Sequence, residues 1–212
     1  MNADIPGQAL LDYQRTGKNA QIIIHSPDFE EDHIDIDYYF RSYNDMPEIE
    51  QKALKLCSGK VLDIGAGAGS HALWLQDNNI DVTALDISPG ACGVMKERGV
   101  KNVVNEDFSG FLNHKFDTIL MLMNGIGITS GLKGLRSFLL KLPDYLSPGG
   151  KLIFDSTNLI YLHTDENGIV SIDLNANYYG EIKFQMEYKN IKGPEFKWLY
   201  IDQDLMQAYC DE

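Results

Sequence analysis

Three glycines at alternate positions follow a short apolar run, and this pattern has the residue types of a ligand-binding turn. Residues 61–69 read Val-Leu-Asp-Ile-Gly-Ala-Gly-Ala-Gly, with the glycines at Gly65, Gly67 and Gly69. Glycine adopts the backbone conformations that a sharp turn requires and leaves no side chain where a ligand must approach. A helical pattern follows at once, and a helix N-terminus presents N–H groups that lack intrahelical partners. The stretch therefore predicts a buried strand that turns into a helix beside a ligand.

The spacing of the glycines distinguishes between classes of ligand. A nicotinamide or flavin fingerprint places its third small residue where this chain has Ser70. The pattern Asp-x-Gly-x-Gly-x-Gly instead resembles motif I of the class I S-adenosylmethionine-dependent methyltransferases. The resemblance implies that S-adenosyl-L-methionine is the cofactor.

Three carboxylates recur at the ends of successive predicted strands: Asp63, Asp86 and Asp107. A carboxylate at the end of the second strand, about 20 residues after the glycines, is placed to accept hydrogen bonds from ribose hydroxyls. Asp86 has this position. Asp107, next to Phe108, is placed to accept a hydrogen bond from an adenine amine while the ring flanks the base.

Four later segments are similar to further motifs of the same family, in the expected order. Residues 84–89 resemble the segment after motif I, residues 105–108 resemble motif II, and residues 116–120 resemble the start of motif IV. The Pro148-Gly149-Gly150 turn is similar to the one that precedes the fifth strand of the family. The resemblance covers residues 61–156, close to half of the chain.

The resemblance implies a role for individual residues in holding the cofactor. Asp63 and the glycine loop would hold the methionine end, and Asp86 the ribose. Ile87, Asp107 and Phe108 would surround the adenine, whereas Met123 and Asn124 would lie near the sulfonium. The expected cofactor-binding residues are thus Asp63, Gly65, Ala66, Gly67, Gly69, Asp86, Ile87, Asp107, Phe108, Met123 and Asn124.

The methyl acceptor is less well defined by the sequence. Met123 and Asn124 are followed by Gly-Ile-Gly, not by the Asn-Pro-Pro-Tyr of enzymes that methylate amino groups of nucleic acids. No basic stretch interleaved with aromatic residues indicates a nucleic-acid groove. A small molecule is therefore the expected acceptor. The residues expected to form the wall of its binding site are Tyr39, Arg41, Asp155, Asn158 and Tyr178.

The expected mechanism is in-line displacement of the methyl group from the sulfonium. No residue is assigned as general base, and His71 is given no chemical role.

Alternating strand and helix patterns from residue 60 onward predict the scaffold that positions these residues. Expected strands cover residues 61–64, 81–85, 102–105, 118–123 and 152–155. Expected helices cover residues 47–56, 70–76, 88–98 and 132–142. Such alternation indicates an α/β fold, a doubly wound Rossmann-like parallel sheet with strand order 3-2-1-4-5. The ligand is expected outside the carboxyl ends of the strands.

The chain is expected to form one globular domain with three parts. Residues 1–47, with a short helix closed by Gly17 and a strand at 21–25, would cover the cofactor site. Residues 48–160 would form the Rossmann-like core. Residues 161–212 would form a hairpin lid and a final helix.

Strict alternation of apolar and polar residues predicts the hairpin near the C-terminus. Residues 181–189 and 196–200 have this period of two, and the turn is expected at residues 192–194. Asp202 is expected to open the final helix, and the chain stops at Glu212. Family members normally add two more strands after this helix. A shortened form of a longer protein is the favoured interpretation, and coverage of the fifth strand by another element is the alternative.

Composition excludes several classes of partner. The 212 residues carry a net charge of −13, which disfavours non-specific binding to nucleic acid or to an anionic membrane surface. The three cysteines lie far apart, so neither a disulfide framework nor a metal site is expected. No apolar run reaches the roughly 18 residues of a membrane span, and the N-terminus lacks the basic start of a signal peptide. A cytoplasmic protein of undetermined oligomeric state is expected.

Three other functions stay open at this point. The chain could bind S-adenosylmethionine without methyl transfer, or transfer another group from a related sulfonium. It could be a nicotinamide oxidoreductase, which Ser70 disfavours. It could also be an interaction protein with a vestigial site.

Overall fold

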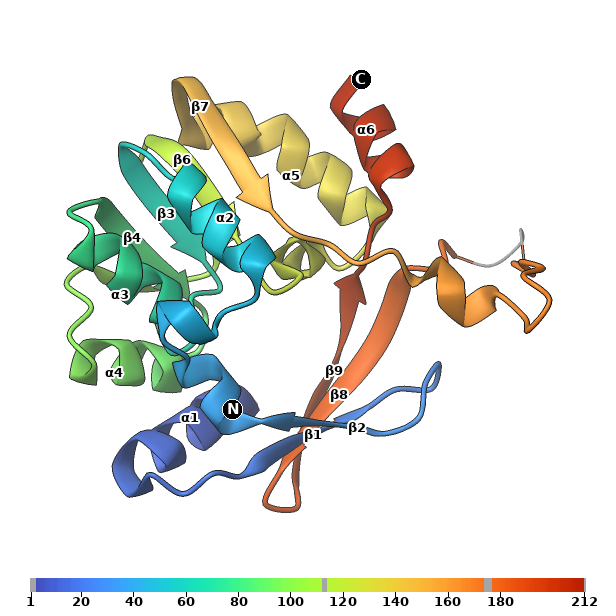
Figure 1. Cartoon of the computed structure of the whole chain (residues 1–212), viewed down its shortest axis with the longest axis horizontal. Helices are drawn as coiled ribbons and strands as arrows, with labels where there is room; N and C mark the ends of the chain where they lie inside the picture. The colour runs from blue at the N-terminus through green and yellow to red at the C-terminus, as the bar shows by residue number, and fades with distance from the viewer. Residues whose placement is uncertain (1–2, 112–113, 174–176, 212) are drawn as a thin grey trace.

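The computed structural model describes residues 3–111, 114–173 and 177–211, which form two sheets (Figure 1). The larger sheet is parallel and has the order β5-β4-β3-β6-β7. Its strands are β3 (Lys60–Ile64), β4 (Asp81–Asp86), β5 (Val103–Asn105), β6 (Phe116–Met121) and β7 (Leu146–Phe154). Because β3 is the first core strand, this is the predicted 3-2-1-4-5 order, and the Rossmann-like prediction is confirmed.

Helices cover both faces of the parallel sheet, as its apolar strands require. They are α2 (Glu48–Leu56), α3 (Ser70–Asp77), α4 (Pro89–Glu97) and α5 (Leu132–Tyr145). Leu54, Leu75 and Met95, from α2, α3 and α4, belong to the apolar cluster on one face. Leu135 and Phe138 of α5 belong to the cluster on the other.

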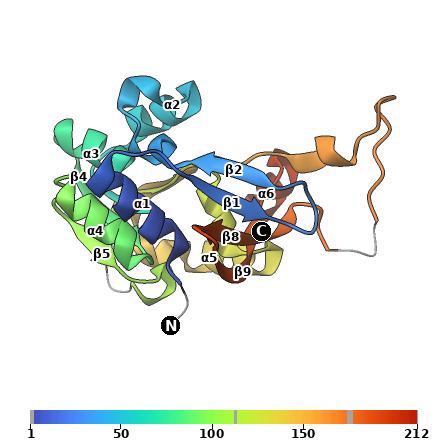
Figure 2. The same cartoon turned by 90° about the horizontal axis from the view of Figure 1, so that it is seen from below.

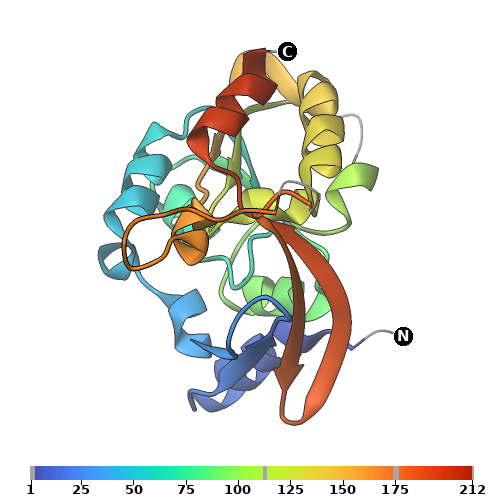
Figure 3. The same ribbon diagram turned by 90° about the vertical axis from the view of Figure 1, so that its right-hand side faces the viewer.

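The second sheet is antiparallel and combines the two ends of the chain. Its order is β2-β1-β8-β9, so two N-terminal strands extend the predicted C-terminal hairpin. The strands are β1 (Gln21–His25), β2 (Asp32–Asp35), β8 (Glu181–Tyr188) and β9 (Ile191–Leu199). The carboxyl ends of the parallel strands point toward this sheet (Figure 1), and the free end of the long hairpin reaches the N-terminal elements (Figure 3). The hairpin is therefore half of a four-stranded sheet, not an isolated insertion.

Helix α1 (Ile5–Thr16) fixes the N-terminal segment to the core. It ends at Gly17 as expected, with the glycine in the left-handed region at φ 64°, but it begins earlier than the predicted residue 8. Asp4 caps its start by accepting a hydrogen bond from the Gly7 N–H. Figure 2 shows α1 beside α4, where a Cβ atom on Gly90 would lie 2.6 Å from the Gly7 backbone. This close packing needs the two glycines.

The hairpin turn lies at Lys189 and Asn190, so the prediction of a turn at residues 192–194 is wrong. Both turn residues have positive φ, 48° and 63°, which suits a two-residue turn between twisted strands. Gly193 and Pro194 instead lie inside β9, where the register with β8 shifts. A proline is tolerated there because β9 is an edge strand and the shift leaves a position without a ladder bond.

Two core strands also differ from their predicted bounds. Strand β6 ends at Met121, because the backbone of Met123 and Asn124 turns into the left-handed region at φ 61° and 55°. Strand β7 begins at Leu146, and the Pro-Gly-Gly segment forms an irregular stretch of pairing with β6 instead of a turn before the strand. In the described ranges, β7 has a strand neighbour on one side only.

The final helix, α6 (Gln203–Asp211), follows Asp202 as predicted. The carboxylate of Asp202 accepts a hydrogen bond from the Leu205 N–H at 2.9 Å. Met206 packs into the cluster that also contains Leu135 of α5. Across the described residues, no helix combines the length and the apolar character needed to cross a membrane. The three-part division of the chain stays a prediction.

Candidate functional site

The glycine loop after β3 is held in an open conformation by backbone turns and by Asp86. Gly65, Gly67 and Gly69 all have positive φ, at 73°, 57° and 82°. The Gly67 N–H donates to Asp86 Oδ2 at 2.9 Å, so the loop is tied to the end of β4. A Cβ atom on Gly69 would lie 2.9 Å from the side chains of Met95 and Val100. Gly69 therefore serves close packing inside the core, whereas Gly65 and Gly67 line the cavity, where a Cβ atom would lie 3.1 Å from the Ile128 side chain and 3.8 Å from the Tyr39 ring.

A cavity of about 820 Å³ lies between this loop and the antiparallel sheet. The loop contributes one wall, and apolar and aromatic side chains of β1, β8 and β9 contribute the opposite wall. Seven of the predicted site residues line it: Tyr39, Arg41, Asp63, Gly65, Ala66, Gly67 and Met123. The structure thus brings N-terminal residues and the glycine loop to one space.

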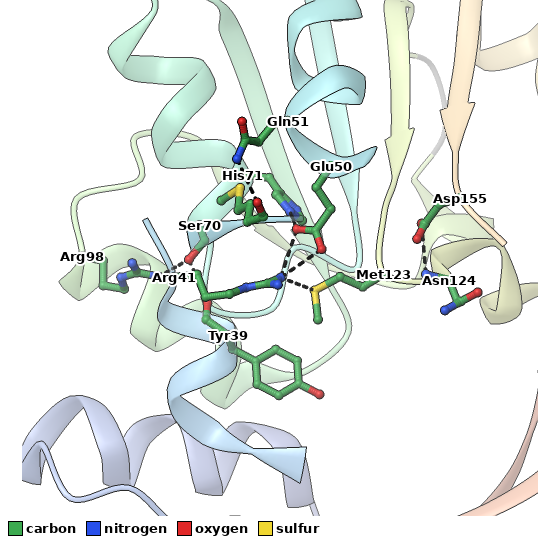
Figure 4. Close-up of polar contacts among 11 residues, drawn as sticks. Tyr39, Arg41, Glu50, Gln51, Ser70, His71, Arg98, Met123, Asn124 and Asp155 are labelled. Carbon is green, nitrogen blue, oxygen red and sulfur yellow. Dashed lines mark hydrogen bonds and ion pairs between the residues drawn. The ribbon is translucent and has the colours of Figure 1, made fainter. Parts of the chain in front are cut away.

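A buried ion-pair network joins Arg41 and His71, which line the cavity, through Glu50 (Figure 4). Arg41 Nη2 donates to both carboxylate oxygens of Glu50, at 3.1 and 3.0 Å, and lies 3.6 Å from Met123 Sδ. His71 Nε2 lies 2.9 Å from Glu50 Oε2. The side chains of Arg41, Glu50 and His71 are only 10%, 4% and 9% exposed. The network therefore fixes Arg41 in a single position beside the glycine loop.

Two charged groups beside the loop keep unused hydrogen-bonding capacity. Within the described part of the chain, Arg41 Nε and Nη1 and Asp63 Oδ2 are buried without a partner. Burial raises the pKa of Asp63 to about 6, although nearby His71 opposes the rise. Buried polar groups are normally hydrogen-bonded, so these atoms indicate a ligand. A guanidinium and a carboxylate that line the same cavity fit a ligand end that carries both a carboxylate and an ammonium, as the methionine end of the expected cofactor does.

Asp86 lies at the end of β4, where the carboxylate that binds the ribose is expected. Besides the Gly67 N–H, it accepts the Ser88 N–H at 2.8 Å. Burial raises the pKa of Asp86, and the two backbone hydrogen bonds act in the opposite direction. Each carboxylate oxygen can accept a further hydrogen bond, so both have capacity for hydroxyl donors.

Comparisons with known proteins decide the family. The methyltransferase domain family matches residues 62–154. An S-adenosylmethionine-dependent methyltransferase from Bacteroides fragilis, solved with S-adenosyl-L-homocysteine, is 42% identical with a TM-score of 0.91. The match covers 98% of this chain and 85% of that one. This chain belongs to the class I S-adenosylmethionine-dependent methyltransferases.

More distant structures share the fold alone. The methyltransferase CcbJ from Streptomyces caelestis is 14% identical, with a TM-score of 0.57 over 80% of this chain and 82% of that one. The PH0226 protein from Pyrococcus horikoshii is 18% identical, with a TM-score of 0.56 over 77% of each chain. No curated protein matches the sequence. Family membership sets aside the nicotinamide alternative.

The predicted adenine residues of the methyltransferase lie outside the lining of the cavity. Ile87 directly follows Asp86 and is 69% exposed, which leaves its apolar side chain free to contact a ring. Asp107 caps a short 3₁₀ helix by accepting the Ser109 N–H at 2.8 Å. Phe108 packs in the core, with ring centroids 5.3 and 4.4 Å from those of Phe138 and Tyr145. Gly69, Asp86 and Asn124 also lie outside the lining.

Three residues predicted for the substrate wall of the methyltransferase make hydrogen bonds to other parts of the protein. Asp155 Oδ1 accepts the Asn124 N–H at 3.0 Å. Asn158 caps the 3₁₀ helix Leu159–His163. The Tyr178 hydroxyl donates to Asp202 Oδ2 at 2.6 Å. The structure places all three outside the lining of the cavity.

Sequence reasoning missed Glu50, and it did not name the aromatic residues of the hairpin lid among the site residues. Glu50 shares the buried side of α2 with Ala53 and Leu54, at positions i, i+3 and i+4. A charged residue in an apolar helical stripe was therefore the available signal. Phe196, Trp198 and Tyr200 were recognised by their period of two, and the structure shows that this face lines the cavity.

Proposed function

We propose that this methyltransferase transfers the methyl group of S-adenosyl-L-methionine to a small molecule that enters the cavity between the glycine loop and the antiparallel sheet. The cavity carries the proposal. Its volume of about 820 Å³ lies within the ~300–1,000 Å³ typical of small-molecule sites. The net charge of −13 disfavours a nucleic acid as the acceptor.

The residues around the loop would hold the cofactor end to end. Arg41 and Asp63 would take the carboxylate and the ammonium of the methionine part. Asp86 would accept hydrogen bonds from the ribose hydroxyls, with Ile87 against the adenine. The Bacteroides fragilis relative, 42% identical, was solved with S-adenosyl-L-homocysteine, which supports this cofactor as the ligand.

The N-terminal segment would close the site from one side. Ser70 Oγ donates to the Tyr39 carbonyl at 2.8 Å, which fixes Tyr39 to the first turn of α3. Burial raises the pKa of Tyr39 to about 12, so the phenol stays neutral. A neutral aromatic ring attracts a cation by about 0.5–2 kcal/mol. Tyr39 is thus suited to a cationic ligand.

When bound, S-adenosyl-L-methionine supplies an electrophilic methyl group on a sulfonium. The protein contributes position and the exclusion of water. Arg41, Asp63 and Asp86 would orient the donor from the loop side, and the antiparallel sheet would hold the acceptor on the other side. When the protein holds both reactants in line, the reaction no longer needs a bimolecular encounter in the correct orientation. The entropy cost of that encounter is a large part of the barrier of the uncatalysed reaction. We assign no general base.

The pKa of Asp63 predicts how cofactor affinity depends on pH. Its carboxyl titrates at about 6 in the folded protein, and only the ionised form attracts an ammonium. We expect the affinity for S-adenosylhomocysteine, measured by isothermal titration, to be about tenfold lower at pH 5 than at pH 7.5. Asp63→Asn should bind more weakly at pH 7.5 and show little dependence on pH. If the affinity of Asp63→Asn for S-adenosylhomocysteine fell as much between pH 7.5 and pH 5 as that of the unaltered protein, another group would be responsible for the pH dependence.

A turnover assay tests the proposed function itself. The protein is first titrated with S-adenosylmethionine, with S-adenosylhomocysteine and with NAD. S-adenosylhomocysteine release is then measured over a panel of small metabolites, with RNA and protein fractions as alternative acceptors. We expect binding of the first two ligands and release with a small metabolite. Release with only the macromolecular fractions would contradict a small-molecule acceptor.

A further inference from the structure

The side of the antiparallel sheet that faces the cavity is a continuous aromatic wall. Phe184 of β8 pairs directly with Phe196 of β9, and their ring centroids lie 6.1 Å apart. Phe196 also contacts Trp198 edge to face at 6.1 Å, and Phe184 contacts Tyr200 edge to face at 6.3 Å. All four line the cavity. The wall can therefore bury an apolar body of the size of an aromatic ring.

Trp198 anchors this wall to the loop that follows β6. Its Nε1 donates to the Asn124 carbonyl at 3.1 Å. A Cβ atom on Gly127 would fall 2.0 Å from the Trp198 Nε1, so the indole ring lies against the backbone there. Met123 of the same loop lines the cavity next to Arg41. The aromatic wall is thus held at a fixed position relative to the cofactor side.

A carboxylate shares this face of the sheet. Asp32, at the start of β2, pairs directly with Ile24 of β1, which in turn pairs with Met186 of β8. Directly paired residues lie on the same side of a sheet, and all three line the cavity. Among the described residues, the Asp32 carboxylate accepts only the neighbouring His33 N–H, at 2.8 Å. Its charge is therefore available to a ligand in the cavity.

The other charges along the cavity are paired within the protein or, like Asp63 and the free nitrogens of Arg41, are assigned to the cofactor in the proposed function. Arg41 is the one permanent cation among the described lining residues, and it is paired with Glu50. Glu31 lies within 3.2 Å of His25 and 3.3 Å of His33. Glu30 and Asp32 remain, both exposed, at the end formed by the antiparallel sheet. This end is negatively charged.

An aromatic wall with free carboxylates is complementary to a cationic group on an apolar body. An ammonium gains attraction from the carboxylates and from the aromatic faces. A carboxylate or phosphate would meet like charge, and a neutral hydroxyl would gain a hydrogen bond but neither charge attraction nor a cation–π contact. The two features come from independent parts of the sheet, β8–β9 and the β1–β2 end, and both favour the same ligand.

We propose that the methyl acceptor is an amine with an apolar body of aromatic size, and that Asp32 with Glu30 attracts its ammonium. This rests on the proposed methyl transfer in the same cavity. The ammonium gives one proton to solvent water on entering the apolar part, because burial disfavours the charged amine. The neutral nitrogen then donates its lone pair to the methyl carbon, while the carbon–sulfur bond breaks and its electron pair stays on sulfur. The products are an N-methylammonium ion and a neutral thioether.

Three probes with one phenyl body and different charge test the proposal: 2-phenylethylamine, 2-phenylethanol and 3-phenylpropionate. Each is titrated into the protein saturated with S-adenosylhomocysteine. We expect the amine to bind best and the carboxylate worst. S-adenosylhomocysteine release from S-adenosylmethionine should occur with the amine and rise with pH as the amine loses its proton. Equal or better binding of the alcohol or the carboxylate, or binding of none of the three, overturns the proposal.

The variant Asp32→Asn isolates the charge with little change in shape. We expect it to weaken amine binding about fivefold, the effect of one exposed charge pair, and to leave 2-phenylethanol unchanged. Asp35→Asn is the matched control, because Asp35 lies on the same strand but on the opposite side of the sheet. Unchanged amine affinity in Asp32→Asn overturns the assignment. Affinity for S-adenosylhomocysteine is measured first: its absence defeats the proposed function, whereas its presence with no preference for the amine defeats only this inference.

Discussion

Replacing Glu50 with glutamine is expected to destabilise the protein by about 3–5 kcal/mol, the usual cost of breaking a buried ion pair. The Glu50 side chain is 4% exposed and binds Arg41 and His71. Burial opposes its charge, but His71 and Arg41 together hold the pKa of Glu50 below its ordinary value. The variant leaves the Arg41 guanidinium buried without a compensating charge. Two nitrogens of this guanidinium already lack partners among the described residues, so little else offsets the loss.

Urea unfolding, followed by tryptophan fluorescence, measures this loss, and Glu48→Gln is its control. Glu48 lies on the same helix, but its ion pair with Lys52 is exposed and screened by solvent, so its loss should change the free energy of unfolding far less than Glu50→Gln does. The pH dependence gives a second check. Because the pKa of Glu50 is lowered from 4.5 on folding, its stabilisation is present above that value and is lost as the pH falls below it. A Glu50→Gln effect as small as that of Glu48→Gln would contradict a network that holds Arg41 in place.

The parallel core was predictable because its signals are local. The glycines at Gly65 and Gly67 mark a turn that needs positive φ, and the carboxylate at Asp86 marks the end of the next strand. Apolar runs separated by helical patterns then specify strands covered on both faces, and the right-handed crossover leaves few topologies. Each of these signals lies within about 30 residues of the chain, so periodicity and turn chemistry suffice.

The antiparallel sheet was only half predictable because its pairing is long-range. Strand β1 pairs with β8, so that Ile23 lies opposite Glu187. The period of two identifies each strand alone but does not say which strands meet. The turn at Lys189 and Asn190 was missed for a related reason: glycine and proline at residues 193–194 are stronger turn signals, yet they fit an irregular edge strand.

The residues of the candidate site also fall into those that local sequence signals predict and those that they do not. Residues whose role follows from backbone geometry, such as Gly67, lie where the motif predicts. Polar residues that merely follow a strand have other partners: Asn158 accepts the Ile160 N–H two residues on, and Asp155 accepts the Asn124 N–H from the loop after β6. The network around Glu50 joins side chains of three separate elements, at Arg41, Glu50 and His71, and no periodic pattern or turn signal connects them.

The variant Asp86→Ala should weaken the binding of S-adenosylhomocysteine about ten- to 150-fold. Loss of a hydrogen bond to a charged group costs about 1.5–3 kcal/mol, and each 1.4 kcal/mol is a factor of ten in affinity. Isothermal titration at constant pH measures the change. Asp81→Ala is the matched control, since Asp81 lies exposed at the opposite end of the same strand, and its affinity should stay at that of the unaltered protein.

Asp86 also accepts the N–H groups of Gly67 and Ser88, so Asp86→Ala could lower affinity by loosening the glycine loop and not by losing the ribose. An analogue of S-adenosylhomocysteine without the two ribose hydroxyls separates these causes. If Asp86 binds the hydroxyls, the unaltered protein should lose affinity for the analogue, whereas Asp86→Ala should bind the analogue and the parent compound almost equally. Two groups in direct contact show such non-additive losses, and groups that act independently do not. Additive losses from the variant and the analogue would therefore show that Asp86 supports the loop without contacting the ribose.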